Sequence, residues 1–232
     1  SNLNIELTST SSEEILELIN NFNFLNKFSK IEFDQLKINS ALNKGLFKID
    51  TLNVIDGESN ATISGEIDIY NKDNRNLEIK LTKFNQFDLF PFPQLEEILT
   101  SLDTNYIDLD CFLTDTNLEI VNLEIPVSRN SNLNITGEVN LKNFKETFLN
   151  IKFNDIKPSH IKTILDQTNQ LRYLNYIELI NFEEIQGSIF LDLKENSTLI
   201  NGIEFIQEDN VIGNISGEIS NSQFKGSVNF EK

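Results

Sequence analysis

The sequence predicts a mainly β protein, built as a long, strongly twisted or curled antiparallel sheet that forms an open groove, with about three short helices. The first observation is period-2 alternation: Ile63, Gly65, Ile67 and Ile69 alternate with polar residues, which places one set on each face of a strand. The second is a short pattern that recurs along the chain, and the third is a small number of helical patterns between the strands.

The same alternation recurs in many other stretches, separated by short clusters of Asn, Asp, Lys and Ser. Such spacing is typical of antiparallel neighbours, so we expect about a dozen strands or more. The stretches are 77–81, 107–113, 133–141, 149–153, 189–193 and 224–230.

An internal repeat lies within these strands. Ile63-Ser64-Gly65-Glu66-Ile67 is matched by residues 135–139 and 215–219. Recurrence at a near-constant spacing indicates repeated structural units, which we place at approximately 1–92, 93–157 and 158–232 of a single elongated segment. Glycines inside strands mark bends or close backbone approach.

Three helical patterns begin with recognisable start signals. Ser11 or Ser12 can cap a helix over 13–21, and Pro93 and Pro158 can open helices over 94–102 and 159–171. A serine cap and a proline in the first turn both satisfy the geometry of a helix N-terminus.

Charge and hydropathy exclude several classes of protein. The formal net charge is −17, with no basic stripe to neutralise phosphates, so nucleic acid is not an expected partner. No stretch reaches the about 18 apolar residues of a membrane span, and the first residues lack the features of a secretory signal. We expect a processed or excised chain whose membrane anchor, if the parent has one, lies outside these residues.

The residues give little support for catalysis. Cys111 is the one cysteine and His160 the one histidine of the sequence. We expect Cys111 to be a small core residue and His160 a surface helix residue. No catalytic group, metal or cofactor is expected. Glutamate pairs at 13–14, 96–97 and 183–184 suit helix ends or surfaces better than a glycosidase cleft. Asp108 and Asp110 share one strand face, without the glycine-containing loop of a calcium site.

The informative feature is a surface, because the strands offer an aliphatic face opposite a polar one. A sheet of this kind either closes into a sandwich or leaves an apolar trough accessible. The repeated helix-and-strand pattern favours the trough.

Several segments resemble the TamB family (translocation and assembly module) within the AsmA-like superfamily of Gram-negative bacteria. The segments are 57–65, 131–144, 185–189 and 223–228, and the similarity covers most of residues 31–232. The resemblance implies a middle fragment of a β-taco-like periplasmic groove, whose parent is anchored in the inner membrane. It further implies phospholipid transport or outer-membrane assembly, with assembly proteins contacted through regions outside this chain.

We therefore expect a non-enzymatic segment that binds or conducts phospholipid or another acyl-chain lipid. The alternatives are a closed β-sandwich acting as a binding or structural module of the cell envelope, and, less favoured, a carbohydrate-active enzyme with an acidic cleft. The residues expected to line one concave side are Ile63, Ile67, Ile69, Leu77, Ile79, Ile135, Val139, Leu149, Ile151, Ile189, Leu191, Ile215 and Val228.

Overall fold

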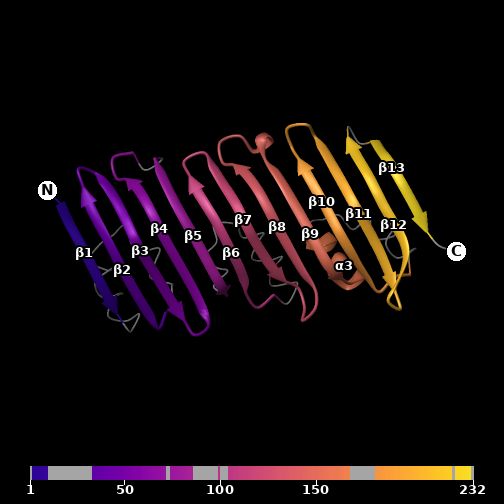
Figure 1. Ribbon diagram of the computed structural model, residues 1–232, viewed down its shortest axis with the longest axis horizontal. Helices are drawn as coiled ribbons and strands as arrows, with labels where there is room; N and C mark the ends of the chain where they lie inside the picture. Colours follow the sequence, from indigo (N-terminus) through magenta and orange to yellow (C-terminus); the bar gives the residue numbers. More distant parts are fainter. Residues whose placement is uncertain are drawn as a thin grey trace. The chain divides into compact units, whose positions relative to one another are not determined.

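The computed structural model describes residues 2–9, 33–71, 74–85, 99, 104–167, 181–220 and 223–230, and these are mainly β. Within each of the two compact units defined below, the described strands form an open sheet in which neighbours along the chain are hydrogen-bonded (Figure 1). The strands are β1 (Asn2–Ser9), β2 (Gln35–Asn43), β3 (Leu46–Asp56), β4 (Ser59–Asp68), β5 (Arg75–Phe84), β6 (Ile107–Thr114), β7 (Asn117–Pro126), β8 (Asn132–Asn140), β9 (Phe148–Ile156), β10 (Glu184–Asp192), β11 (Ser197–Gln207), β12 (Asn210–Ser220) and β13 (Gln223–Phe230). The predicted antiparallel, many-stranded sheet is confirmed.

The contacts divide the chain into two compact units. Unit 1 comprises Ser1–Pro91 with Tyr106–Val121, and unit 2 comprises Phe92–Asn105 with Asn122–Lys232. Consecutive strands from β1 to β6 are antiparallel in unit 1, and so are consecutive strands from β8 to β13 in unit 2. The predicted division at 1–92, 93–157 and 158–232 stays a prediction.

The helical elements among the described residues are the α-helix α3 (Pro158–Gln167) and the 3₁₀ turn η3 (Phe144–Glu146), with Leu99 as a single further helical residue. The helix predicted over 159–171 is confirmed as far as 167, and Pro158 opens it as expected because the first helical turn needs no amide donor from that position. The helix predicted over 13–21 lies outside the described residues, and of 94–102 only Leu99 is described, in helical conformation. "About three helices" therefore overstates what the described residues contain.

The strands recur in sets of four. Long connections, residues 10–34, 85–106 and 157–183, follow β1, β5 and β9. They delimit the sets β2–β5, β6–β9 and β10–β13. The three copies of the sequence repeat fall in β4, β8 and β12, the third strand of each set.

The repeat glycines share an unusual backbone conformation. Gly65, Gly137 and Gly217 have φ values of +129°, +140° and +152°, a region that L-residues rarely adopt. A Cβ on Gly65 would lie 2.0 Å from the carbonyl oxygen of Asn76 on β5. The expected close backbone approach is confirmed, and the register beside Gly65 and Gly217 also shifts, as at a β-bulge.

The strand after each glycine strand repeats as well. Cross-strand register makes three residues on β5, β9 and β13 equivalent. The equivalent trios are Leu77, Ile79 and Leu81 on β5; Leu149, Ile151 and Phe153 on β9; and Gly226, Val228 and Phe230 on β13.

Candidate functional site

One face of unit 1 carries unbroken rows of apolar side chains across β2–β6. Ile38, Leu52, Ile63, Ile79 and Cys111 lie opposite one another in successive strand pairs. Directly opposite residues in an antiparallel sheet point to the same side, so these five form one continuous row. We call this surface the apolar face of unit 1.

A second row on the same face lies two residues away. Its members are Leu36, Val54, Ala61, Leu81 and Leu109, again paired strand by strand. Because strand residues two apart share a face, the two rows join into one apolar surface.

Unit 2 has an equivalent surface, which we call the apolar face of unit 2. Ile135, Ile151, Ile189 and Ile200 form a row across β8–β11. On β11–β13 the apolar face continues through the opposed residues Ile203, Ile215 and Val228.

Nearly all the predicted lining residues lie on these two faces. In unit 1 they are Ile63, Ile67, Leu77 and Ile79, and in unit 2 they are Ile135, Val139, Leu149, Ile151, Ile189, Leu191, Ile215 and Val228. Ile69 differs, because β4 ends at Asp68 and the Ile69 side chain is 43 % exposed in the following bend. The alternation of 63–69 therefore continues one residue past the strand.

Several residues of the apolar faces were not among those predicted from the sequence, including Leu52, Ile200 and Ile203. They lie on β3 and β11, where register shifts interrupt the period-2 pattern between Ile49 and Leu52 and between Ile200 and Ile203. A bulge inserts a residue into one strand, so strict alternation fails at these register shifts. Gly65 lies opposite Ile49 and Gly217 lies opposite Ile200, at the start of each register shift. These two glycines are the sequence signal that could have located the shifts.

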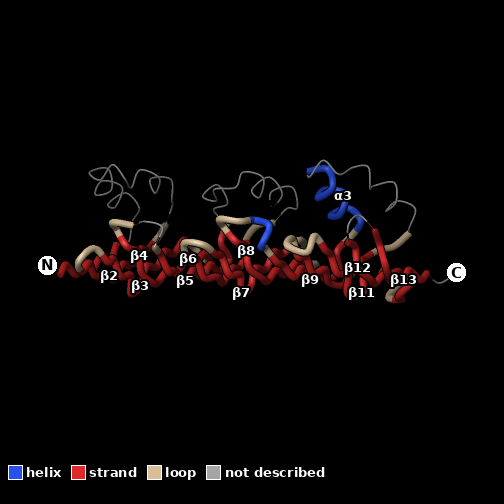
Figure 2. The backbone as a smooth tube through the Cα atoms, turned by 90° about the horizontal axis from the view of Figure 1, so that it is seen from above, coloured by secondary structure: helices blue, strands red, loops and turns tan. Residues whose placement is uncertain are grey.

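The side chains of the apolar faces differ in how deeply they are buried. In unit 1, Leu36, Ile49, Leu77, Leu81 and Cys111 are buried, whereas most of the remaining apolar residues are half-buried. In unit 2 the core cluster of Val127, Phe153 and Ile156 is packed against partly buried residues that include Ile161 of α3. Figure 2 shows α3 on one side of the unit 2 strands, and the contact of Ile161 places the helix over the Phe153 end of the apolar face.

The opposite face of unit 1 is polar and charged. Lys37, Asn53, Thr62, Lys80 and Asp110 form a row across β2–β6. Lys80 Nζ lies 2.7 Å from Glu78 Oε1 and 3.8 Å from Asp110 Oδ2. Its hydrogen bond to Glu78, with the charges of both carboxylates, raises the pKa of Lys80 above its usual value.

The face of unit 2 opposite its apolar face carries both polar and aromatic side chains. Asn134, Lys152, Ser188 and Asn201 form a polar row across β8–β11. The neighbouring row includes Phe190, whose ring centroid lies 6.5 Å from that of Phe148. The expected contrast between an aliphatic and a polar face is therefore sharper in unit 1 than in unit 2.

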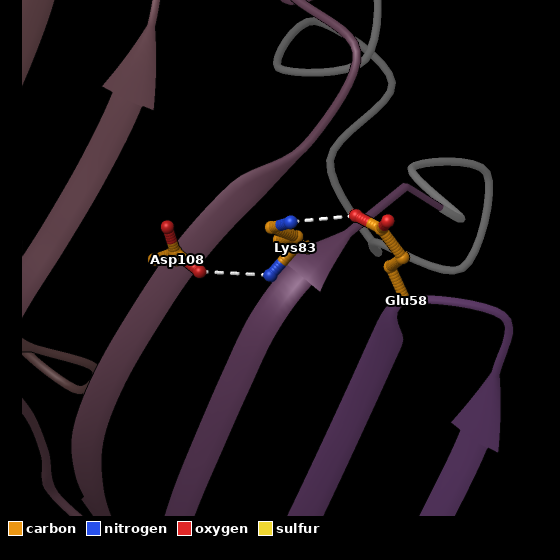
Figure 3. Close-up of polar contacts among 3 residues, drawn as sticks. All are labelled: Glu58, Lys83 and Asp108. Carbon is orange, nitrogen blue, oxygen red and sulfur yellow. Dashed lines mark hydrogen bonds and ion pairs between the residues drawn. The ribbon is translucent and has the colours of Figure 1, made fainter.

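A second charged group surrounds Lys83, where β5 changes register against β6 between Leu81 and Phe84. The Lys83 backbone N–H donates to Asp108 Oδ1 at 2.7 Å, and its Nζ donates to Glu58 Oε2 at 2.5 Å (Figure 3). The hydrogen bond to Lys83 and its charge lower the pKa of Glu58, and the same pair raises the pKa of Lys83. Asp108 thus satisfies an amide that the bulge releases from the strand ladder.

The single cysteine and the single histidine occupy structural positions. Cys111 is 1 % exposed, and burial, followed by the charge of Asp110, raises its pKa to about 11. His160 Nδ1 accepts a hydrogen bond from the Lys157 backbone N–H at 3.4 Å, and partial burial lowers its pKa. Within the described ranges, no group of three or more His, Cys, Asp or Glu residues is placed to hold a metal ion.

None of the helical segments that the structure describes is long and apolar enough to span a membrane. Comparison of the chain with protein-family models, curated proteins and solved structures finds no match. The apolar faces of the two units are therefore the candidate site on structural grounds alone.

Proposed function

We propose that the chain is a non-enzymatic lipid-binding segment whose apolar faces hold acyl chains inside a curled, groove-like sheet. The observation that carries this proposal is the unbroken cross-strand row, Ile38 to Cys111 in unit 1 and Ile135 to Ile200 in unit 2. In this proposal the chain acts in the periplasm in phospholipid transport or outer-membrane assembly, as the TamB resemblance implies.

The energetics of acyl binding suit such a surface. Each methylene removed from water contributes about 0.8 kcal/mol and requires only continuous apolar contact. The two rows contain no charged side chain. Beside the rows of unit 1, Arg75 on β5 lies opposite Ile67 on β4 and brings a positive charge next to the apolar face. An acyl chain lying across the strands would therefore meet aliphatic groups throughout.

The repeat glycines support the curled form of the sheet. A β-bulge bends its strand and increases the local twist, and bulge-like register shifts accompany Gly65 and Gly217. A third shift occurs beside Gly187, a fourth glycine of the same conformation, with φ +147°. Curvature at Gly65 and Gly217, each on the third strand of its set, would turn the sheet of each unit toward one face.

Position-specific photo-crosslinking of lipid tests the proposal. A photoreactive amino acid at Ile135 should yield phospholipid adducts, while the same probe at Asn134 should not, because Asn134 belongs to the polar row. The two probes occupy adjacent residues of one strand, so they are matched in depth and strand position. Adducts are detected by mass spectrometry of protein purified from cells.

Substitution of Ile135 by Asp separates an open face from a sealed core. On an open face Ile135→Asp leaves the thermal melt close to the parent and removes lipid, whereas in a sealed core it buries an unpaired charge and unfolds the unit. Ile135 is a better position than Ile67, since an Asp at 67 would lie opposite Arg75 and could pair with it. Unfolding of Ile135→Asp, together with equal or absent adducts at 134 and 135, would leave the closed binding or structural module as the better description.

A further inference from the structure

One arginine lies on the apolar face of unit 1, at the end where β5 begins. Arg75 is directly opposite Ile67 on β4, and because strand residues two apart share a face, it lies on the same side as Leu77. Leu77 is 9 % exposed, and Arg75 is half-buried. A positive charge is therefore held directly beside the aliphatic rows.

The contacts of Arg75 among the described residues do not neutralise its charge. Its Nε donates to the Thr114 backbone carbonyl oxygen at 3.4 Å, which is a long hydrogen bond to an uncharged acceptor. The ion pairs among the described residues join Lys48, Lys80 and Lys83 to carboxylates and do not include Arg75. The chain has 36 acidic and 19 basic residues, so a shortage of carboxylates does not explain this difference.

The chemistry of the guanidinium group indicates what kind of ligand it would take. An arginine side chain stays protonated at physiological pH, and it carries five N–H donors in a planar fork. The contact with Thr114 uses one of these donors. A half-buried cation loses part of its hydration, and an anion that accepts its hydrogen bonds replaces the lost water. Phosphate oxygens match the geometry of the fork.

The repeated sheet is built without a charge at the equivalent positions of unit 2. Leu77, Leu149 and Gly226 are equivalent, since each lies opposite a repeat glycine. The residues two positions earlier, which correspond to Arg75, are Thr147 and Phe224. Thr147 is 3 % exposed, and its hydroxyl accepts a hydrogen bond from the Asn140 backbone N–H. Strand pairing and packing therefore do not require an arginine at this place in the repeat.

We propose that Arg75 binds the phosphate group of a lipid whose acyl chain lies on the apolar face of unit 1. The inference rests on the proposed lipid-binding function and adds a headgroup site to it. At about 3.4 Å per strand residue, Arg75 lies about 7 Å from Leu77 and about 14 Å from Ile79 along β5. This separation suits a lipid in which a polar linker joins the phosphate to the acyl chain.

Two amphiphiles that differ only in the phosphate test the site on the whole chain. Lysophosphatidate and the monoacylglycerol with the same acyl chain are titrated by calorimetry, each below its critical micelle concentration. We expect lysophosphatidate to bind at least about tenfold more tightly, because hydrogen bonds between charged groups are the stronger ones. Inorganic phosphate alone should not compete, since it lacks the acyl contact and the net charge of −17 repels it.

Two substitutions with the same change in net charge locate the bound phosphate. Arg75→Gln should lower the affinity for lysophosphatidate to that for the monoacylglycerol. Lys80→Gln should preserve the difference between the two ligands, because Lys80 belongs to the polar row on the other face of the same strand. Thermal melts verify that both variants are folded. Arg75→Lys, which keeps the charge and loses the planar fork, should retain part of the preference.

A measurement on the unsubstituted protein makes the test independent of how the variants fold. The sequence contains three arginines, Arg75, Arg129 and Arg172, so their Nε–H resonances can be followed separately by NMR. Lysophosphatidate should shift the Arg75 resonance, and the monoacylglycerol should leave it close to its position in the free protein.

The outcomes separate failure of the headgroup site from failure of the proposed function. If neither amphiphile binds, the lipid-binding function is wrong and the headgroup site with it. If both bind with equal affinity, or if Arg75→Gln keeps the preference for lysophosphatidate, the apolar face binds acyl chains without a headgroup site at Arg75. If inorganic phosphate shifts the Arg75 resonance at the same concentration as lysophosphatidate, the site takes a soluble anion, and the assignment to a lipid is overturned.

Discussion

Replacement of Gly65 by alanine tests whether the repeat glycines are required by backbone geometry. At φ +129° an L-residue costs about 1–3 kcal/mol. The added Cβ would also lie 2.0 Å from Asn76 O and 2.9 Å from Leu77 Cα. Both atoms belong to the backbone of β5, so relief requires the strand pair to separate.

The expected loss for Gly65→Ala is about 3 kcal/mol or more of unfolding free energy, the sum of conformational strain and disturbed pairing. Gly57→Ala is the matched control in the same unit. Gly57 has φ +56° and no atom within 4 Å of an added Cβ, so only the left-handed backbone penalty of about 1–2 kcal/mol applies.

Urea unfolding followed by far-UV circular dichroism measures both variants. A second pair, Gly137→Ala and Gly202→Ala, repeats the comparison in unit 2. A Cβ on Gly137 would lie 2.3 Å from Phe148 O, whereas Gly202 has its nearest neighbour at 4.0 Å. Equal losses within each pair would refute the argument that close backbone approach selects glycine at the repeat positions.

Two further predictions concern side chains with shifted pKa values. Cys111, buried and with a pKa of about 11, should react with a thiol reagent at pH 8 at least about 100-fold more slowly in the native protein than in urea, because the thiolate is the reacting form; rates within tenfold of each other would contradict its core position. Glu58 has a lowered pKa, so its contribution to stability is present above the usual value of 4.5 and is lost as the pH falls through the folded value. In a carboxyl NMR titration, Lys83→Ala should raise the pKa of Glu58, and the control Lys80→Ala should not. An unchanged Glu58 pKa in Lys83→Ala would exclude the Glu58–Lys83 ion pair in solution.

Local periodicity was sufficient to predict most of the strands. The stretches around Ile63, Ile135 and Ile215 became β4, β8 and β12 because alternation gives each strand one apolar face. The sequence did not reveal that the strands recur in sets of four. That regularity depends on the positions of the long connections, and the helical patterns within them carry no information about pairing order.

The candidate site was predictable where alternation is regular and not where bulges interrupt it. Ile79 and Ile151 were identified from pattern, whereas Leu52 and Ile203 were missed because extra residues on β3 and β11 shift their phase. Exposure was not predictable either. Leu77 is buried and Val228 is exposed, although both lie on apolar faces, since burial depends on which strand or helix lies beside each residue.

Each strand set contains four strands, and this even number fixes the direction of the strand that precedes each long connection. Four antiparallel steps restore the strand direction, so β1 and β5 run the same way in unit 1, and β9 and β13 do in unit 2. In unit 1 the long connections after β1 and β5 therefore leave the sheet from the same end. After β9 the connection forms α3, whose Ile161 packs toward Phe153 and Ile156. The helix thus covers the Phe153 end of the apolar face of unit 2, so an acyl chain bound as proposed would lie on the part of that face away from α3.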